Sequence, residues 1–221
     1  MSQIIQAAPA QLRSPLLYAG VAAGPLYVGI GTLEAVLRDG FDIRVHSLSL
    51  LANGPAGWVH SAMMIITGLL TVLGAIGLRR GSASPKPSGV TIGGIAVFGL
   101  GVAAAGFLRA DPQGNFPLGT PAGPPEMITW HGIGHLVAGG IGFLGLIIAC
   151  LAYARRSQRS GRRGWAVFSL ITGVYYLISF AGIASGAGNA VINIAFTIAV
   201  ALGWTWLTLL CLAALKKGQR A

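Results

Sequence analysis

The sequence predicts an all-α integral membrane protein, and its composition and patterning are the basis for this prediction. Of the 221 residues, 54% are hydrophobic and only 9% are charged, whereas soluble domains carry about a quarter charged residues. The mean hydropathy of +0.72 is correspondingly high. Six apolar stretches are each long enough to cross a bilayer, which takes ~20 helical residues. Because lipid offers backbone groups no hydrogen-bond partners, we expect one transmembrane domain built as a six-helix bundle.

The expected spans are separated by short polar or Pro/Gly-rich connections. The first stretch is longer than the apolar core of a cleavable signal peptide, which is usually about 7–15 residues, so it is expected to remain as a span. The six spans are predicted near residues 16–37, 56–78, 89–109, 130–153, 164–184 and 190–214.

Charge separates between the two sides of this arrangement. Of the 15 Lys and Arg residues, only Arg38, Arg44 and Arg109 fall on the side opposite the N-terminus. The positive-inside rule therefore predicts that both termini are cytoplasmic. All five acidic residues lie on the opposite, outer side; they are Glu34, Asp39, Asp42, Asp111 and Glu126.

The net charge of +10 does not indicate nucleic acid binding. The basic residues form short runs at the ends of apolar stretches, and no basic groove with interleaved aromatic residues is visible. We therefore expect no nucleic acid partner. Cys150 and Cys211 lie inside apolar runs and are expected to be small buried hydrophobes.

Two long connections lie on the outer side, at 38–55 and 110–129. In the first, Ser47 is expected to close a turn or cap a short helix, and Asn53, followed by Gly and Pro, breaks the chain before the second span. The density of prolines in the second connection favours an ordered, extended lid. Ordered chain is therefore expected to concentrate on the outer face.

Asp111 follows the third span and leaves a carboxylate at the membrane surface. We expect Arg44 or Arg109 to neutralise it.

The histidines also lie at the outer ends of the spans. His131 and His135 are four residues apart and share one face of a helix. Together with His60 they form a candidate Zn²⁺ site, in which Asp111 or Glu126 would position a water molecule. Ionisable residues inside a membrane are costly and commonly functional. The four histidines are His46, His60, His131 and His135.

Small and polar residues recur at helical spacing, which indicates a partly polar interior or hydrogen bonds between helices. The stripes are His60, Met64, Thr67, Thr71 and Gly74; His131, His135, Ala138 and Gly142; Ser169, Thr172, Tyr176 and Ser179; and Asn189, Asn193 and Thr197.

Three functions are compatible with these residues. The first is a metal-assisted hydrolase or related lipid enzyme. The second is a b-type haem protein with His60 and either His131 or His135 as axial ligands. The third is a non-catalytic accessory or structural subunit that packs against other membrane proteins or a second copy of itself. The histidine spacing is loosely similar to that of alkaline-ceramidase-like hydrolases, although those have seven spans and a serine motif that we do not find here.

The expected ligand is a lipid-like or isoprenoid molecule that enters an outward-facing pocket from the outer leaflet. Aromatic side chains around a few polar groups are typical of small-molecule sites, although they also serve as interfacial anchors. The aromatic candidates are Phe41, Phe107, Phe116 and Trp130.

Two outer motifs carry a family resemblance. The first is the run from Arg38-Asp39-Gly40-Phe41-Asp42 through His46-Ser47-Leu48-Ser49 to Asn53-Gly54-Pro55-Ala56-Gly57-Trp58, and the second runs from Gly106-Phe107 to Asp111-Pro112, ahead of His131 and His135. Together they resemble the domain-of-unknown-function 998 (DUF998) family of six-span bacterial and archaeal membrane proteins. The resemblance implies six helices and outward-facing loop motifs, and it implies no activity. We expect the protein to lie in the cell membrane, the bacterial or archaeal inner membrane.

Overall fold

The computed structural model describes residues 13–81, 83, 85–125, 127–186 and 189–218, and it is all-α. Six helices are long and apolar enough to span a membrane, so the predicted number of spans is confirmed. A short 3-10 helix, η1 (Leu48–Ala52), lies between the first two. The six helices are α2 (Arg13–Leu37), α3 (Gly57–Arg80), α4 (Gly89–Phe107), α5 (Trp130–Arg159), α6 (Arg163–Ala184) and α7 (Ala190–Gly218).

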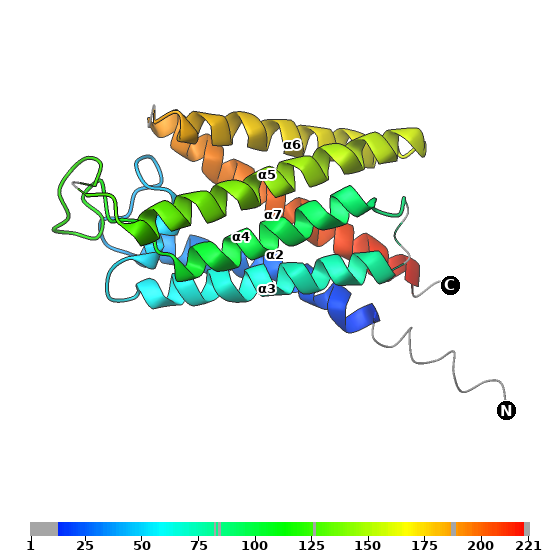
Figure 1. Cartoon of the computed structure of the whole chain (residues 1–221), viewed down its shortest axis with the longest axis horizontal. Coiled ribbons are helices and arrows are strands. Elements are labelled where there is room, and N and C mark those ends of the chain that lie inside the picture. The colour runs from blue at the N-terminus through cyan, green and yellow to red at the C-terminus, as the bar shows by residue number, and fades with distance from the viewer. Residues whose placement is uncertain (1–12, 82, 84, 126, 187–188, 219–221) are drawn as a thin grey trace.

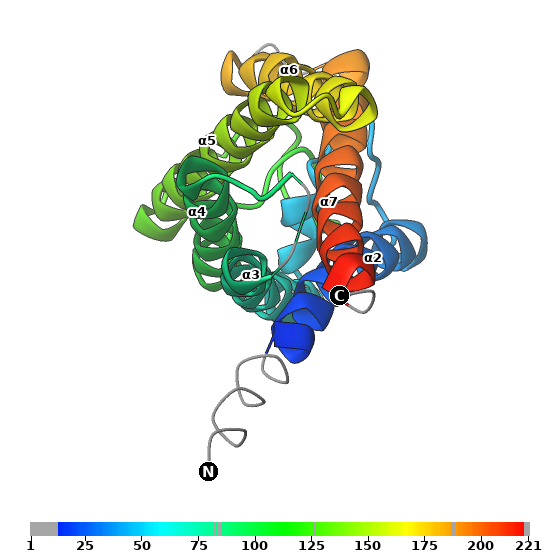
Figure 2. The ribbon, with the colours of Figure 1, turned by 90° about the vertical axis from the view of Figure 1, so that its right-hand side faces the viewer.

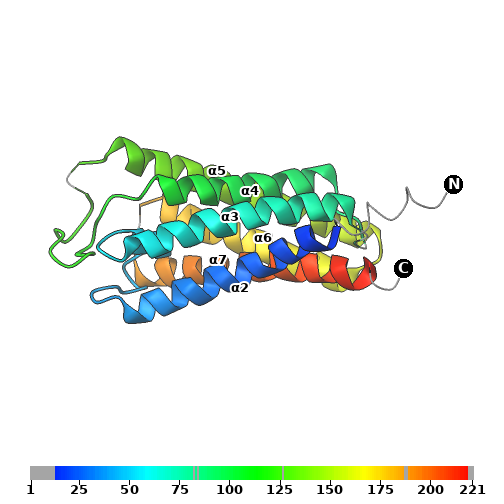
Figure 3. The same ribbon diagram turned by 90° about the horizontal axis from the view of Figure 1, so that it is seen from below.

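The helices form a closed ring in chain order. Each helix packs against its neighbours along the chain, and α7 packs against α2 to complete the ring (Figure 2). All six run along the long axis of the molecule, and the start of α2 and the end of α7 share one end (Figures 1 and 3). We call the opposite end the loop end. There, the two long loops 38–56 and 108–125 form what we call the loop cap.

Local sequence explains where several helices start. The Ser88 hydroxyl accepts a hydrogen bond from the backbone N–H of Thr91 at the start of α4, and Thr129 accepts one from Gly132 at the start of α5. Such caps satisfy backbone groups that the first helical turn leaves unpaired. Helix α5 continues to Arg159, beyond the expected end near residue 153, and its last turn contains the basic residues Arg156 and Arg159.

Glycines allow α4 to approach both of its neighbours closely. A Cβ atom on Gly68 of α3 would lie 2.5 Å from the carbonyl oxygen of Gly99 on α4. A Cβ atom on Gly101 would lie 2.7 Å from the Cα of Gly142 on α5. Small residues at these contacts bring backbones together where lipid provides no hydrophobic driving force. This packing gives a physical role to part of the chain's unusual glycine content.

The centre of the ring is filled by aromatic side chains. Tyr27 of α2 stacks on Trp204 of α7 with 4.7 Å between ring centroids, and Phe98 of α4 lies 5.0 Å from the same indole. All three side chains are buried. A cavity between α2 and α7 is lined in part by residues of the first long loop, so it lies toward the loop end.

The predicted polar stripes on α3 and α6 face the interior, since their residues are buried. Their threonines, however, bond mainly within their own helices. The hydroxyls of Thr67, Thr71 and Thr172 each donate to the backbone carbonyl four residues earlier. This arrangement satisfies the hydroxyl inside a helix and replaces the expected bond between helices at these positions.

Candidate functional site

A cluster of ionisable side chains joins α2 to α3 near the loop end. His60 is fully buried, and its Nδ1 lies 2.7 Å from Oε2 of Glu34. Nη1 of Arg38, the residue that directly follows α2, lies 3.8 Å from the other carboxylate oxygen. Because a carboxylate only accepts hydrogen bonds, Nδ1 of His60 carries the hydrogen. In the neutral ring Nε2 is then an acceptor, and it is buried with no hydrogen-bond partner among the described residues.

Arg38 connects this cluster to the loop cap. Its guanidinium donates to the backbone carbonyls of Leu51, at 3.1 Å, and of Asn53. The same group lies over the ring of Phe116, 5.4 Å from the centroid, in a cation–π contact. One arginine therefore ties the end of α2 to both long loops.

Two further side chains hold the loops together. His46 accepts a hydrogen bond at Nδ1 from the backbone of Asp42, so its Nε2 carries the hydrogen and donates to the carbonyl of Gly114 at 2.8 Å. Asn53 donates to the carbonyl of Ala110 at 3.1 Å. The predicted ordered lid is thus a pair of interlocked loops.

Asp111 binds the start of α5. Thr129 donates to it from both its backbone N–H and its hydroxyl, and these bonds hold the pKa of the Asp111 carboxyl below its usual value. A Cβ atom on Gly132 would overlap the carboxylate, so the absence of a side chain there makes room for it. Thr129 in turn accepts from Nδ1 of His131, whose side chain is 44% exposed. Asp111 and His131 therefore belong to a structural junction at the rim.

His135 borders the interior. Its Nδ1 contacts the carbonyl oxygens of Ala105 at 2.9 Å and Leu108 at 2.8 Å, near the end of α4. Carbonyls only accept, so Nδ1 donates, and in the neutral ring Nε2 is left as the acceptor. His135 lines a cavity of about 110 Å³ that also touches Tyr27, Met64 and Thr197.

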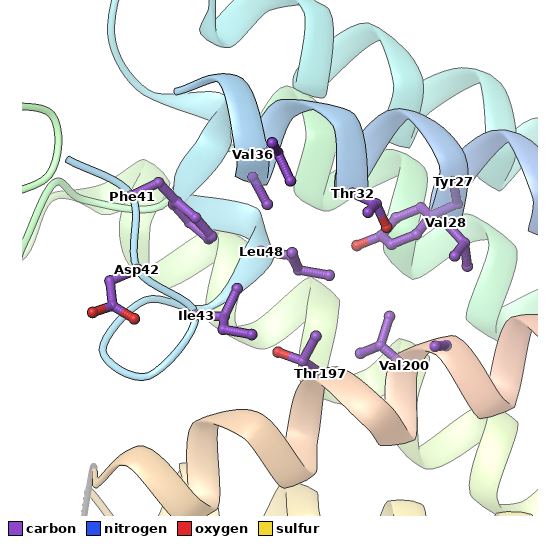
Figure 4. A pocket seen from close by; sticks show the side chains of 12 residues that line it. Tyr27, Val28, Thr32, Val36, Phe41, Asp42, Ile43, Leu48, Thr197 and Val200 are labelled. Atoms are coloured by element: carbon purple, nitrogen blue, oxygen red, sulfur yellow. The ribbon is translucent and has the colours of Figure 1, made fainter. Parts of the chain in front are cut away.

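A larger cavity of about 390 Å³ lies between α2 and α7 beneath the first loop (Figure 4). Most of its lining side chains are apolar. The hydroxyl of Tyr27 is directed into the space between the two helices, whereas that of Thr197 donates to the carbonyl of Asn193 on its own helix. Val36, which is 77% exposed, borders it on α2. The two cavities adjoin because they share four lining residues: Tyr27, Leu48, Thr197 and Val200.

The candidate zinc residues are placed at different points. His60 pairs with Glu34, His131 with Thr129, and His135 with backbone carbonyls. Within the described part of the chain, no group of three His, Cys, Asp or Glu side chains lies close enough to hold a metal ion. Glu126 lies outside the described residues.

The haem hypothesis also gains no support from the geometry. Of the proposed axial ligands, His135 lines the smaller cavity, whereas His60 and His131 lie outside its lining.

Other expected partners also differ from those observed. Arg44 pairs with Asp42 through a contact of 2.7 Å, which lowers the pKa of that carboxyl to about 2, instead of neutralising Asp111. The contact of Arg109 with this region is its backbone carbonyl, 3.3 Å from Nδ1 of His131. Ser47 precedes η1 without a side-chain cap, and its hydroxyl lies 3.3 Å from that of Ser49.

The expected aromatic residues are divided between two environments. Phe41 lines the larger cavity and Phe116 is buried in the loop cap. Phe107 and Trp130 are more than 70% exposed, as suits interfacial anchors.

Sequence reasoning missed the roles of Glu34 and Arg38. Their spacing of four residues at the end of the first span is a visible signal, since a carboxylate within a span needs a compensating charge. It also missed the capping role of Asn193 on α7, which donates to the carbonyls of Arg44 and Val45 and so holds the first loop against the cavity. That contact joins positions 149 residues apart and has no local signal.

A family model described as a protein of unknown function (DUF998) matches residues 21–213. Among curated proteins and solved structures, nothing matches the chain.

Proposed function

The chain belongs to the DUF998 family, whose description assigns no activity. From the geometry of the site, we propose that this multi-pass membrane protein binds a lipid-like small molecule between its membrane-spanning helices. The observation that carries the proposal is the pair of adjoining cavities at the loop end. A mostly apolar concavity with a few placed polar groups is the usual form of a small-molecule site.

The position of the larger cavity suits a ligand from the bilayer. It lies along the seam of α2 and α7, and both helices are candidate spans. Exposed Val36 and the partly exposed Ala201 border it, so an apolar chain could enter sideways without crossing the loop cap. The positive-inside distribution of Lys and Arg supports a position of this end at the outer leaflet.

The ionisable cluster of Glu34, His60 and Arg38 is connected to the loops and to the side chains that line the cavities. Arg38 fixes the loops, Asn193 fixes the first loop to α7, and Tyr27 connects the cluster to both cavities through an edge contact with His60, 6.3 Å between ring centroids. These contacts hold the polar groups of the cavities in defined positions, which reduces the ordering cost of binding.

The test is to identify what the purified protein carries. Lipids extracted from the wild type would be compared by mass spectrometry with those from Ala201→Phe, which fills the larger cavity. Ala213→Phe is the matched control, since it makes the same change on α7 in a surface depression beside α6. We expect a specific molecule that is depleted in Ala201→Phe and retained in Ala213→Phe. Equal amounts in all three proteins would contradict the proposal.

A further inference from the structure

The charges around the two cavities restrict the polar end of any ligand. Among the described residues that line them, none is a Lys or Arg. One carboxylate, that of Asp42, stands at the rim of the larger cavity, and Figure 4 shows it turned away from the space that the other side chains face. It is already compensated by Arg44 at 2.7 Å. A charged headgroup would therefore find no free counter-charge here.

Two side chains of the cavities have committed their hydrogens elsewhere and offer acceptors, whereas the hydroxyls of Tyr27, Thr32, Ser47 and Ser49 can donate or accept. His135 commits the hydrogen on Nδ1 to two carbonyls of the α4 end, which leaves Nε2 with a lone pair in the neutral ring. Thr197 commits its hydroxyl hydrogen to the carbonyl of Asn193 at 3.0 Å, which leaves its oxygen as an acceptor. A ligand that donates a hydrogen bond satisfies these atoms, whereas an anionic group would face them unfavourably.

The volumes of the two cavities determine how a ligand is oriented in them. The smaller cavity, about 110 Å³ beside His135, accommodates a small polar end, and the adjoining space of about 390 Å³ accommodates an apolar body that leads out between α2 and α7. A buried ammonium would require an unpaired carboxylate, and the one at the rim is paired. A neutral hydroxyl meets neither difficulty.

We infer that the ligand is an uncharged lipid alcohol, an apolar chain or ring system ending in a hydroxyl that donates to Nε2 of His135. This inference rests on the proposed function and specifies its ligand class.

The experiment compares four compounds of equal chain length: hexadecanol, hexadecanoate, hexadecylamine and hexadecane. Delipidated full-length protein in phosphatidylcholine nanodiscs would receive each at the same mole fraction, and affinity would be taken from the shift of the thermal unfolding midpoint. We expect hexadecanol to bind about tenfold more tightly than the other three, as one added hydrogen bond in a dry site predicts. If hexadecanoate or hexadecylamine binds most tightly, the alcohol inference is wrong while lipid binding stands. If none of the four binds, the proposed function itself fails.

Two substitutions at His135 locate the acceptor. In His135→Asn the side-chain amide nitrogen takes the place of Nδ1 and can still donate to the α4 carbonyls. The same substitution removes the acceptor at Nε2. In His135→Gln the amide reaches the position of Nε2. We expect the Asn variant to bind hexadecanol no better than hexadecane and the Gln variant to keep the preference. Should His135→Asn not fold, Thr197→Val removes the second acceptor with little change of shape and should lower the preference about threefold. An alcohol preference unchanged in the variants that fold would overturn the assignment.

Discussion

Nδ1 of His60 on α3 lies 2.7 Å from Oε2 of Glu34 on α2, and the imidazole is completely buried. With Arg38 3.8 Å from the same carboxylate, a neutral His60 leaves the cluster electrically compensated. A compensated cluster is the form in which ionisable groups persist inside a membrane protein. It connects two spans and, through Arg38, the loops above the cavities.

Removing the carboxylate charge should destabilise the fold. Glu34→Gln keeps the shape and can still accept from His60, but it leaves the largely buried guanidinium of Arg38 uncompensated. We expect a loss of about 3 kcal/mol in the free energy of unfolding, measured by circular dichroism in detergent. The control is Asp39→Asn, an exposed carboxylate nearby, which should cost less than about 0.5 kcal/mol.

The coupling can be isolated by adding Arg38→Met. If charge compensation is the cause, the double variant loses less stability than the sum of the two single variants, by at least about 1 kcal/mol. Strictly additive losses would show that the two side chains act independently.

The membrane orientation can be tested with single cysteines. Gln113→Cys lies in the loop cap and Ser160→Cys in the exposed connection between α5 and α6. The native Cys150 and Cys211 are both buried, so wild type should label weakly. An impermeant thiol reagent on intact cells is expected to label Gln113→Cys and to reach Ser160→Cys only after permeabilisation. The reverse pattern would place the termini outside.

Hydropathy and length were sufficient to predict the six spans, because crossing a bilayer imposes both on each helix separately. The inward direction of His60, Thr67 and Thr71 also followed, since residues three and four apart share a helix face. The sequence did not predict which residue each buried polar side chain contacts. The partner of His60 is Glu34, on the preceding span, and the height at which two helices pack depends on small-residue contacts that no local pattern encodes.

The pair His131 and His135 shows the same limit. Both lie on one face of α5, as predicted, yet they meet different surroundings. His135 reaches the last carbonyls of α4, whereas His131 is one turn nearer the helix start, at the rim, and packs against Thr129. A shared helix face predicts the direction in which two side chains point, and it does not predict how deep in the bundle each one lies.

Close helix packing predicts opposite effects for two alanine substitutions on α4. In Gly101→Ala the new Cβ would lie 2.6 Å from the carbonyl oxygen of Ala138, so α4 and α5 must separate. We expect a loss of about 1–3 kcal/mol. Gly93→Ala meets nothing within 4 Å and should be neutral or stabilising by up to about 1 kcal/mol, because alanine favours the helix. Thermal unfolding of both variants is the measurement, and equal effects would argue against the glycine contact.

The junction of Asp111 and Thr129 predicts a defined pH dependence. Donation from Thr129 lowers the pKa of the folded Asp111 carboxyl below its ordinary value of 3.8, so the bond stabilises the folded loop above that pH and is lost as the pH falls through the lower, folded value. Hydrogen exchange at the Thr129 amide, corrected for intrinsic rates, should therefore stay slow from pH 8 to about pH 5. Asp111→Asn should speed it about tenfold at pH 7, since the amide lacks the charge that strengthens both bonds. Asp42→Asn is the control: its carboxylate pairs with Arg44, so the Thr129 amide should not respond. Slow exchange at Thr129 in Asp111→Asn would mean that the start of α5 holds without the carboxylate.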